Sequence, residues 1–312
     1  MSCFHPITAW KTEAGIIFYN PYKDNRNHKG FKIPCRQCTG CRSEYSRQWA
    51  MRILHEASLN LHNSFITLTY NNAHLPGTQP DDNGNYDAEG TLKLSDWQNF
   101  MKRLRKKYVP KNPNPELKNP DAIRFYHCGE YGEKDRRPHY HAVLFNHQFN
   151  DLIPIPGKKN LYQSKQLNKL WGKGFCSVGH VTFESAAYVA NYVQKKITGK
   201  HSYLSYLNIH GEPIQPEYST MSRNPGIARD WFDKYHEDVY PSDYITIKGR
   251  KMRPPKYYDR QYEILYKETF PIIKKNREES FKKIQHQFTP EALKQKELNH
   301  KAKMALYKRN QL

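Results

Sequence analysis

The sequence predicts an α+β fold in which helices pack on a mainly antiparallel sheet. The prediction rests on short runs rich in β-branched and aromatic residues, longer runs with helical periodicity, and the element order β-α-β-β-α-β-α. The chain has 312 residues with 23 Tyr and 14 Phe, enough for a substantial core. Its formal net charge of +20 favours a polyanionic partner, either nucleic acid or an acidic membrane surface, with solubility alone as the other explanation.

The six cysteines are expected to be thiols or metal ligands rather than disulfides. The chain has no run of 18 apolar residues and no signal-like apolar start, so we expect neither membrane insertion nor export. Cys35, Cys38 and Cys41 are spaced by two residues each, and Cys3 lies upstream. This spacing favours a structural zinc site that stabilises the N-terminal segment, with an iron–sulfur cluster or unliganded thiols as alternatives.

The first helix is predicted over residues 43–62, where apolar residues recur at steps of three and four. Residues 65–70 follow as a strand dense in β-branched side chains, and a loop rich in Asp, Asn, Gly and Pro covers 71–90. The next helix is predicted to begin at Ser95, because Gln98 three residues later completes a capping-box pattern.

A second strand is predicted over residues 123–128, and a turn at 129–132 leads into a third strand over 137–145. These two strands are expected to form an antiparallel pair. Three further elements follow along the chain: a helix over 164–171, a strand over 175–183 and a helix that begins near Ser185.

The chain beyond Gly199 has a less regular pattern, and residues 219–227 have the composition of a loop. Residues 248–312 contain 18 Lys or Arg against 7 Asp or Glu, which predicts a basic helical tail that contacts DNA or is only solvated. We expect four parts: a Cys-rich N-terminal segment with a helix (1–63), a catalytic core (64–200), an accessory extension (201–258) and the basic helical tail (259–312).

His139 and His141 alternate on the strand over 137–145, so both side chains point to one face, roughly 6.6 Å apart. Two neutral imidazoles at this spacing can bind one divalent cation. The alternative is a pair of partly exposed strand histidines with no ligand.

Tyr188 and Tyr192 are four residues apart on the last predicted helix and share one face, with Lys195 three residues further on. A phenol with a pKa near 10 is a poor nucleophile at neutral pH, but a nearby cation favours the phenolate. The pair could therefore form a covalent phosphotyrosine, or its rings could simply cover the sheet.

The order of these parts resembles the three motifs of HUH endonucleases, in which U is a bulky hydrophobic residue. The three parts are the apolar strand at 65–69, His139-Tyr140-His141, and Tyr188-x3-Tyr192-x2-Lys195. Four further segments are similar to replication initiation proteins of microviruses, among them the gokushovirus group. They are Cys-Gly-Glu-Tyr-Gly (128–132), Arg-Pro-His-Tyr-His (137–141), Tyr-Val-Ala-Asn-Tyr-Val (188–193) and Met-Ser-Arg-Asn-Pro-Gly-Ile (221–227). The resemblance extends from the N-terminal cysteines to about Tyr258.

This resemblance implies a five-stranded antiparallel core and an enzyme of rolling-circle replication that nicks and rejoins single-stranded DNA at a viral origin. His139 and His141 would bind Mg²⁺ or Mn²⁺, with Glu130 as the oxygen ligand that such hard ions prefer. One tyrosine would attack the phosphate, leaving a 5′-phosphotyrosyl bond and a free 3′-hydroxyl. The second tyrosine would act when the circle is closed, and Lys195 would position a phosphate or phenolate.

The resemblance also implies how the two tyrosines divide the work and which partners they need. Because Tyr192 has Lys195 nearby and Tyr188 has Asn191 where many relatives have Lys or Arg, we expect Tyr192 to make the first cut. The expected partners are single-stranded origin DNA and the replicative-form duplex in the host bacterial cytoplasm, together with a host helicase and polymerase, since no ATPase motif is present. The expected DNA contacts are Arg137, Lys196 and Arg223.

Two other functions remain as alternatives. One is a non-catalytic, zinc-stabilised DNA- or RNA-binding protein. The other is a zinc hydrolase built on His139 and His141, which would need further ligands and a base to activate water. The coincidence of His-x-His with Tyr-x3-Tyr favours the nuclease, because simple binding does not require it.

Overall fold

The computed structural model describes residues 3–21, 30–77, 90–112, 119–132, 136–192, 202–208 and 210–309. The chain divides into two compact units: residues 48–240, and residues 1–47 together with 241–312. No helix in the described ranges is long and apolar enough to span a bilayer.

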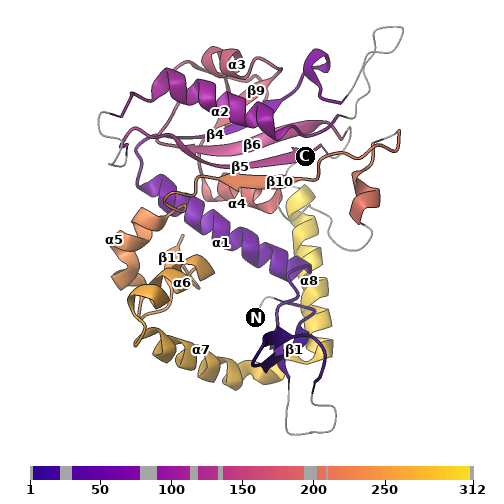
Figure 1. The fold of residues 1–312 in the computed structure, drawn as a ribbon, viewed down its shortest axis with the longest axis vertical. Helices are drawn as coiled ribbons and strands as arrows, with labels where there is room; N and C mark the ends of the chain where they lie inside the picture. Colours follow the sequence, from indigo (N-terminus) through magenta and orange to yellow (C-terminus); the bar gives the residue numbers. More distant parts are fainter. Residues whose placement is uncertain are drawn as a thin grey trace. The chain divides into compact units, whose positions relative to one another are not determined.

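A seven-stranded antiparallel sheet is the centre of the described part of the 48–240 unit, in the order β10-β5-β6-β4-β9-β8-β7 (Figure 1). The strands are β4 (Asn63–Thr69), β5 (Arg124–Tyr131), β6 (Pro138–Phe145), β7 (Leu152–Pro154), β8 (Leu161–Ser164), β9 (Cys176–Gly179) and β10 (Tyr218–Met221). The α+β class is confirmed. The expected number of five strands is wrong, because the described sheet has seven, with the β7–β8 hairpin at one edge and the late strand β10 at the other.

Helices cover both faces of this sheet, α2 and α3 on one side and α4 on the other (Figure 1). They are α2 (Leu94–Tyr108), α3 (Lys165–Trp171) and α4 (Phe183–Tyr192). On β4, Ile66 and Leu68 belong to the core on the α2 and α3 side. Because side chains alternate along a strand, Phe65 and Thr67 point to the α4 side. The same unit also contains η1 (Asn72–His74), η2 (Ser202–Tyr206) and α5 (Arg229–Val239).

Helix α2 buries Trp97, Phe100, Met101 and Leu104, and Tyr108 packs half-buried against the same core, as apolar residues at steps of three and four in this segment predict. The expected capping box at Ser95 is wrong, because the helix begins at Leu94 and its N-cap, Lys93, makes no side-chain cap bond. Tyr140 fixes this end instead. Its hydroxyl accepts from the backbone N–H of Lys93 (2.9 Å) and donates to the Lys93 carbonyl (3.0 Å).

Strand β5 continues through most of the segment predicted as a turn at 129–132. Glu130 pairs with His139 and Tyr131 pairs with Pro138, so both residues belong to the sheet. The turn prediction is wrong because tertiary contacts outweigh the two glycines: Tyr131 is buried and Glu130 bonds to His139 opposite it.

Three other boundaries differ from the sequence prediction. The loop expected over 219–227 begins with strand β10, because β5 supplies backbone partners for it. The strand expected over 175–183 is the shorter β9, since Phe183 begins α4. The first helix is confirmed with shifted bounds as α1 (Thr39–Ser58).

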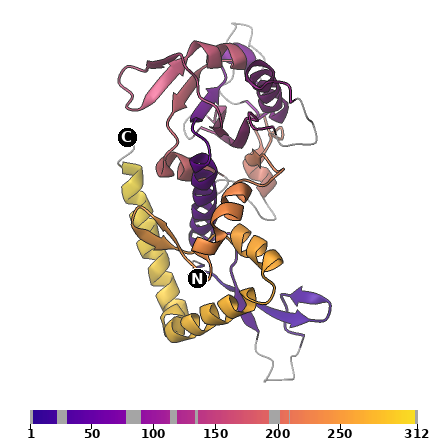
Figure 2. The same ribbon diagram turned by 90° about the vertical axis from the view of Figure 1, so that its left-hand side faces the viewer.

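The second unit combines residues from both ends of the chain. Its elements are β1 (Ile7–Thr12), β2 (Gly15–Ile17), β3 (Phe31–Ile33), the start of α1, β11 (Ile245–Ile247), β12 (Arg250–Met252), α6 (Lys256–Leu265), α7 (Phe270–Ile284), η3 (Gln285–Phe288) and α8 (Pro290–Arg309). Figure 2 shows α7 and α8 as successive long helices at a steep angle. His5 Nε2 lies 2.7 Å from Glu297 Oε2, and Ser43 Oγ lies 3.1 Å from His300 Nε2, so α8 contacts the N-terminal segment.

Candidate metal centre and nucleophile

Strand pairing brings Glu130, His139 and His141 together on the α4 face of the sheet. Glu130 lies directly opposite His139, and Cys128 lies opposite His141. The Oε1 atom of Glu130 is 2.6 Å from His139 Nε2 and 3.0 Å from His141 Nε2. The three ligand atoms all lie within 4.8 Å of one another, so one divalent cation can reach all three.

The far side of each imidazole ring is held by a second contact. His139 Nδ1 lies 3.0 Å from the carbonyl oxygen of Arg137, and His141 Nδ1 lies 3.0 Å from Thr67 Oγ1. A carbonyl only accepts, so Nδ1 of His139 donates to Arg137, and Nε2 is the ring nitrogen that faces Glu130. Contacts of this kind orient histidine ligands in metal sites.

Glu130 is suited to be the anionic ligand of this centre. Burial raises the pKa of its carboxyl, but the contacts with His139 and His141 outweigh burial and lower the pKa below its ordinary value. Two imidazoles and one carboxylate oxygen leave positions open for water or a phosphate oxygen, as Mg²⁺ and Mn²⁺ require. The donor set therefore fits the ions that the sequence predicts.

Helix α4 carries Tyr188 to this centre. Ala186, Val189 and Ala190 are fully buried, and two of these three side chains are small, which lets the helix approach β5 and β6 closely. The Tyr188 ring packs edge-on against His141, with ring centroids 5.1 Å apart, and remains 37% exposed. A partly exposed phenol thus lies beside the candidate metal ligands.

Other predicted residues lie outside the described part of the structure. Helix α4 ends at Tyr192, whose side chain is not described, and Lys195 and Lys196 lie beyond it, outside the described residues. The contribution of Tyr192, Lys195 and Lys196 stays a prediction.

Of the two described arginines expected at DNA, Arg137 lies next to the centre and Arg223 does not. Arg223 is exposed and follows Ser222, whose backbone N–H donates to the Phe125 carbonyl (3.0 Å). Phe125 and Glu130 are separated along β5 by roughly 17 Å. Any DNA contact of Arg223 would therefore lie away from the metal centre.

Thr67 is a residue of the site that the sequence pattern did not indicate. Its signal is weak: a hydroxyl in an apolar strand, at a position that the alternation along β4 places on the same face as Phe65. Only the register of β4 with β6, which pairs Thr67 with His141, shows its role.

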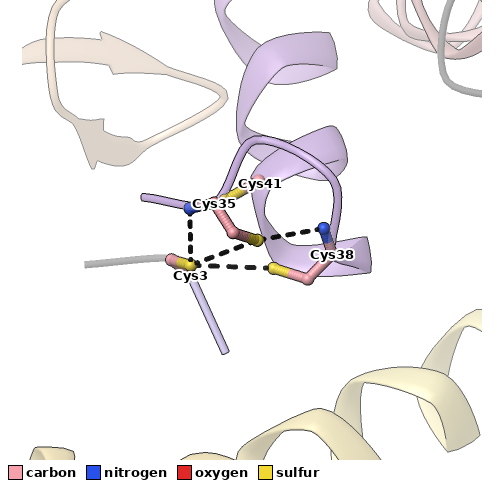
Figure 3. Close-up of side chains that lie close together, drawn as sticks. All are labelled: Cys3, Cys35, Cys38 and Cys41. Atoms are coloured by element: carbon pink, nitrogen blue, oxygen red, sulfur yellow. Dashed lines mark hydrogen bonds between the residues drawn. The ribbon is translucent and has the colours of Figure 1, made fainter. Parts of the chain in front are cut away.

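The cysteines of the N-terminal segment form a second cluster, seen in Figure 3. The Sγ atom of Cys3 lies 3.6 Å from that of Cys35 and 3.9 Å from that of Cys38. All four sulfur atoms, including that of Cys41, lie within 4.8 Å of one another. Tetrahedral zinc with Zn–S bonds of about 2.3 Å holds its sulfurs about 3.8 Å apart, whereas a disulfide needs about 2.05 Å. The spacing fits a four-thiolate metal site.

Backbone N–H groups stabilise negative charge on these sulfurs. The N–H of Phe4 donates to Cys38 Sγ, and those of Cys35 and Cys38 donate to Cys3 and Cys35, each at 3.3 Å. Burial raises the pKa of the Cys38 thiol, but the N–H groups of Phe4 and Cys41 outweigh burial and lower the pKa to about 6. Burial raises the pKa of Cys3 and Cys41, which a bound cation would offset.

Comparison with known proteins relates most of the chain to replication-associated proteins of phages. A family profile of replication-associated proteins of the ORF2 type matches residues 63–197, the segment from β4 to just beyond α4. Replication-associated protein VP4 of Bdellovibrio phage phiMH2K is 31% identical over 268 residues, which cover 84% of this chain and 78% of that protein. Replication-associated protein ORF2 of Spiroplasma virus 4 is 33% identical over 305 residues, 91% of this chain and 88% of that protein.

A third relative matches a smaller share of its own length. Replication-associated protein ORF4 of Chlamydia phage 1 is 29% identical over 235 residues, 73% of this chain and 53% of that protein. No solved structure matches the chain significantly.

Proposed function

The chain belongs to the family of ORF2-type replication-associated proteins, and we propose that it starts rolling-circle replication by cutting and rejoining single-stranded DNA at a viral origin. The observation that carries this proposal is the position of Tyr188 against His141, beside the Glu130–His139–His141 group. A DNA-binding protein without catalysis has no need of an accessible phenol at a group of metal-ligating side chains.

The roles of the residues follow from this arrangement. Glu130, His139 and His141 would hold Mg²⁺ or Mn²⁺, and the bound cation would draw charge from the non-bridging oxygens of a phosphodiester. The attacking tyrosine loses its phenolic proton and forms a bond from its oxygen to phosphorus. The bond from phosphorus to the 3′-oxygen breaks, and that oxygen takes up a proton. The products are a 5′-phosphotyrosyl bond and a 3′-hydroxyl that can prime synthesis.

Two tyrosines on one helix suit a reaction with two transfers. Tyr188 lies at the metal ligands, and Tyr192 follows one helical turn later on α4. We retain the sequence-based order, in which Tyr192 with Lys195 makes the first cut and Tyr188 takes the strand in the later transfer. The protein would act in the host bacterial cytoplasm, on the origin single strand and the replicative-form duplex, with a host helicase and polymerase.

The four-cysteine cluster would hold a structural zinc ion. The sulfur spacing and the N–H contacts to sulfur support this assignment. Zinc would join Cys3 to the start of α1, where Cys41 lies in the first turn. Metal binding would then contribute directly to the stability of the unit formed by residues 1–47 and 241–312.

The decisive experiment incubates the purified protein with labelled single-stranded origin DNA and Mn²⁺. Denaturing electrophoresis should show a DNA–protein adduct that forms only with the metal ion and survives boiling in detergent. A protein that shifts the DNA in a native gel, yet forms no adduct under any metal condition, would instead be a non-catalytic DNA-binding protein.

A further inference from the structure

A surface pocket of about 540 Å³ lies at the end of β4, next to the metal centre and outside its ligand set. It is lined by Thr69, Asn71, Asn72, Arg137 and Phe175, among others. Thr69 connects the pocket to the centre, because it pairs with His139 across β4 and β6. The pocket therefore opens beside the place where a scissile phosphate would lie.

Phe175 presents an aromatic ring on the same face of the sheet as the histidines. Its backbone N–H donates to the Thr69 carbonyl (3.0 Å) and its carbonyl accepts from the Thr69 N–H (2.8 Å), so the two residues lie opposite each other. Residues opposite each other in an antiparallel pair share a face, so His139, Thr69 and Phe175 form a row across three strands. With strands about 4.8 Å apart, Phe175 lies roughly 10 Å from His139.

The ring of Phe175 is exposed, although its backbone is firmly held. Its side chain is 73% exposed. Gly174 allows the backbone to approach β4 closely, since a Cβ there would lie 2.3 Å from the Thr69 carbonyl oxygen. The local structure thus holds the backbone of a residue whose large apolar ring lies in solvent. This ring contributes little to the packing of the unit.

A cationic side chain, Arg137, also lines this pocket. Arg137 donates from Nη1 to the Tyr70 carbonyl (3.0 Å) and from Nη2 to Asn72 Oδ1 (2.6 Å). These two bonds fix the guanidinium at the pocket wall. A positioned guanidinium and a positioned aromatic ring are the groups that bind the phosphate and the base of a single-stranded nucleotide.

We propose that this pocket binds the nucleotide next to the scissile phosphate, with its base stacked on Phe175 and its backbone phosphate at Arg137. This inference rests on the proposed function for the identity of the strand, and it adds the site that sets the register of that strand against the metal centre. A base held there fixes which phosphate reaches the ligands, so the pocket contributes to the choice of cutting position.

The first test measures binding of a labelled thymidine oligomer of about 12 nucleotides to the full-length protein in EDTA, where no cleavage occurs. Phe175→Ala should weaken binding about tenfold, within the range that loss of one stacked base produces. Phe175→Tyr should bind as the wild type does. Leu61→Ala is the matched control, an 89% exposed apolar side chain near the opposite end of β4.

The second test locates the base. Oligonucleotides spanning the mapped cutting position are made with a single abasic nucleotide at each place in turn. For the wild type, an abasic site at one nucleotide adjacent to the cut should lower the affinity about tenfold. For Phe175→Ala, an abasic site at that nucleotide should lower the affinity no further. The inference is overturned if Phe175→Ala binds the thymidine oligomer like the wild type, or if it shows the same abasic losses.

The two tests separate this inference from the proposed function. If the wild type forms adducts and Phe175→Ala binds the thymidine oligomer as tightly as the wild type, the nuclease proposal stands and the pocket inference is refuted. If the wild type forms no adduct and Phe175→Ala binds the thymidine oligomer tenfold more weakly than the wild type, the nuclease proposal is refuted and the base-stacking pocket stands.

Discussion

Glu130 and His139 are directly opposite each other on β5 and β6, and Oε1 of the first lies 2.6 Å from Nε2 of the second. The hydrogen bonds of the two strands hold this pair, so the ligand set is organised by the backbone rather than by a loop. Ligands on paired strands lose little conformational freedom when they bind an ion. The metal centre is therefore the part of the site whose substitution has the clearest expected outcome.

Removing a ligand should abolish cutting and leave DNA binding largely intact. We expect His139→Ala and His141→Ala to form no DNA adduct with Mn²⁺, because neither retains the full ligand set. Isothermal titration should show Mn²⁺ affinity reduced by about tenfold or more, while native gels show DNA affinity within about twofold of wild type, because phosphate contacts elsewhere remain. Undiminished cutting by both variants would refute the metal assignment.

Thr67 offers a graded version of this test. Thr67→Val retains every ligand but removes the oxygen that lies 3.0 Å from His141 Nδ1. Loss of such a supporting contact costs roughly 10- to 100-fold in metal affinity, and Thr67→Ser should recover most of it. Equal affinities for Val and Ser at this position would show that the contact has no role.

Phenylalanine variants of the two tyrosines should be blocked at different steps of the reaction. Tyr192→Phe is expected to suppress the first covalent adduct, whereas Tyr188→Phe should cut the DNA but not close the circle. Mass spectrometry of the DNA-linked peptide after a single cleavage decides the order. An adduct found wholly on Tyr188 reverses the assignment, and equal labelling of both residues makes them interchangeable.

Zinc should be present in the purified protein and should stabilise it. We expect elemental analysis to find one zinc per chain, and Cys38→Ser to lose the metal and unfold at a lower temperature. Cys176→Ser is the control, because this buried thiol lies on β9, outside the cluster. Protein prepared without chelators that contains no metal would contradict the assignment.

The basic C-terminal helices should contribute to the salt dependence of DNA binding. Because α8 contacts the N-terminal segment, substitution tests this better than truncation, which would remove part of a unit. Lys275, Lys282 and Lys283 are exposed on α7, and changing all three to Gln should reduce the salt slope for single strands by about 2, at about 0.7 per lost phosphate contact. An unchanged slope would mean that α7 is only a solvated surface.

Acid should destabilise the 48–240 unit through its buried histidines. Burial lowers the pKa of His147 to about 4, in a ring packed against Tyr108 and Phe149. Between about pH 6.5, near the unfolded value, and about pH 4, the unfolded chain binds the extra proton, so the free energy of unfolding falls as the pH falls. His147 accounts for about 3 kcal/mol over this range, at about 1.36 kcal/mol per pH unit. Denaturant titrations should show that the free energy of unfolding depends less steeply on pH in His147→Gln than in the wild type. His286→Gln, at an exposed histidine, is the control.

The strand that carries His139 and His141 was predictable because its information is local. Alternation along 137–145 places His139 and His141 on one face whatever the strand pairs with. Glu130 was predicted as a ligand within a turn, and the turn was wrong, because the glycines at 129 and 132 are a strong turn signal and the pairing partner was unknown. Its location on β5 depends on contacts with β6, which local sequence does not encode.

The parts that could not be predicted depend on long-range register. Thr67 becomes a contact of His141 only through the pairing of β4 with β6, and β10 becomes a strand only because β5 offers it an edge. The start of α2 was predicted at Ser95 from a capping pattern, whereas the hydroxyl of Tyr140, 47 residues from Lys93, fixes it. Phe175 gave no signal, because an exposed ring and a buried one look the same in a sequence.

The unit that contains residues 3–47 is completed only by residues 241–309, and this has a consequence for biosynthesis. A ribosome that adds about 5–20 residues per second needs roughly 10–40 s to pass from residue 47 to residue 241. Throughout this interval His5 lacks Glu297 and Ser43 lacks His300. The four thiols, in contrast, are all synthesised once Cys41 has been added, so the candidate metal ligands of the cluster are complete long before the rest of the unit exists.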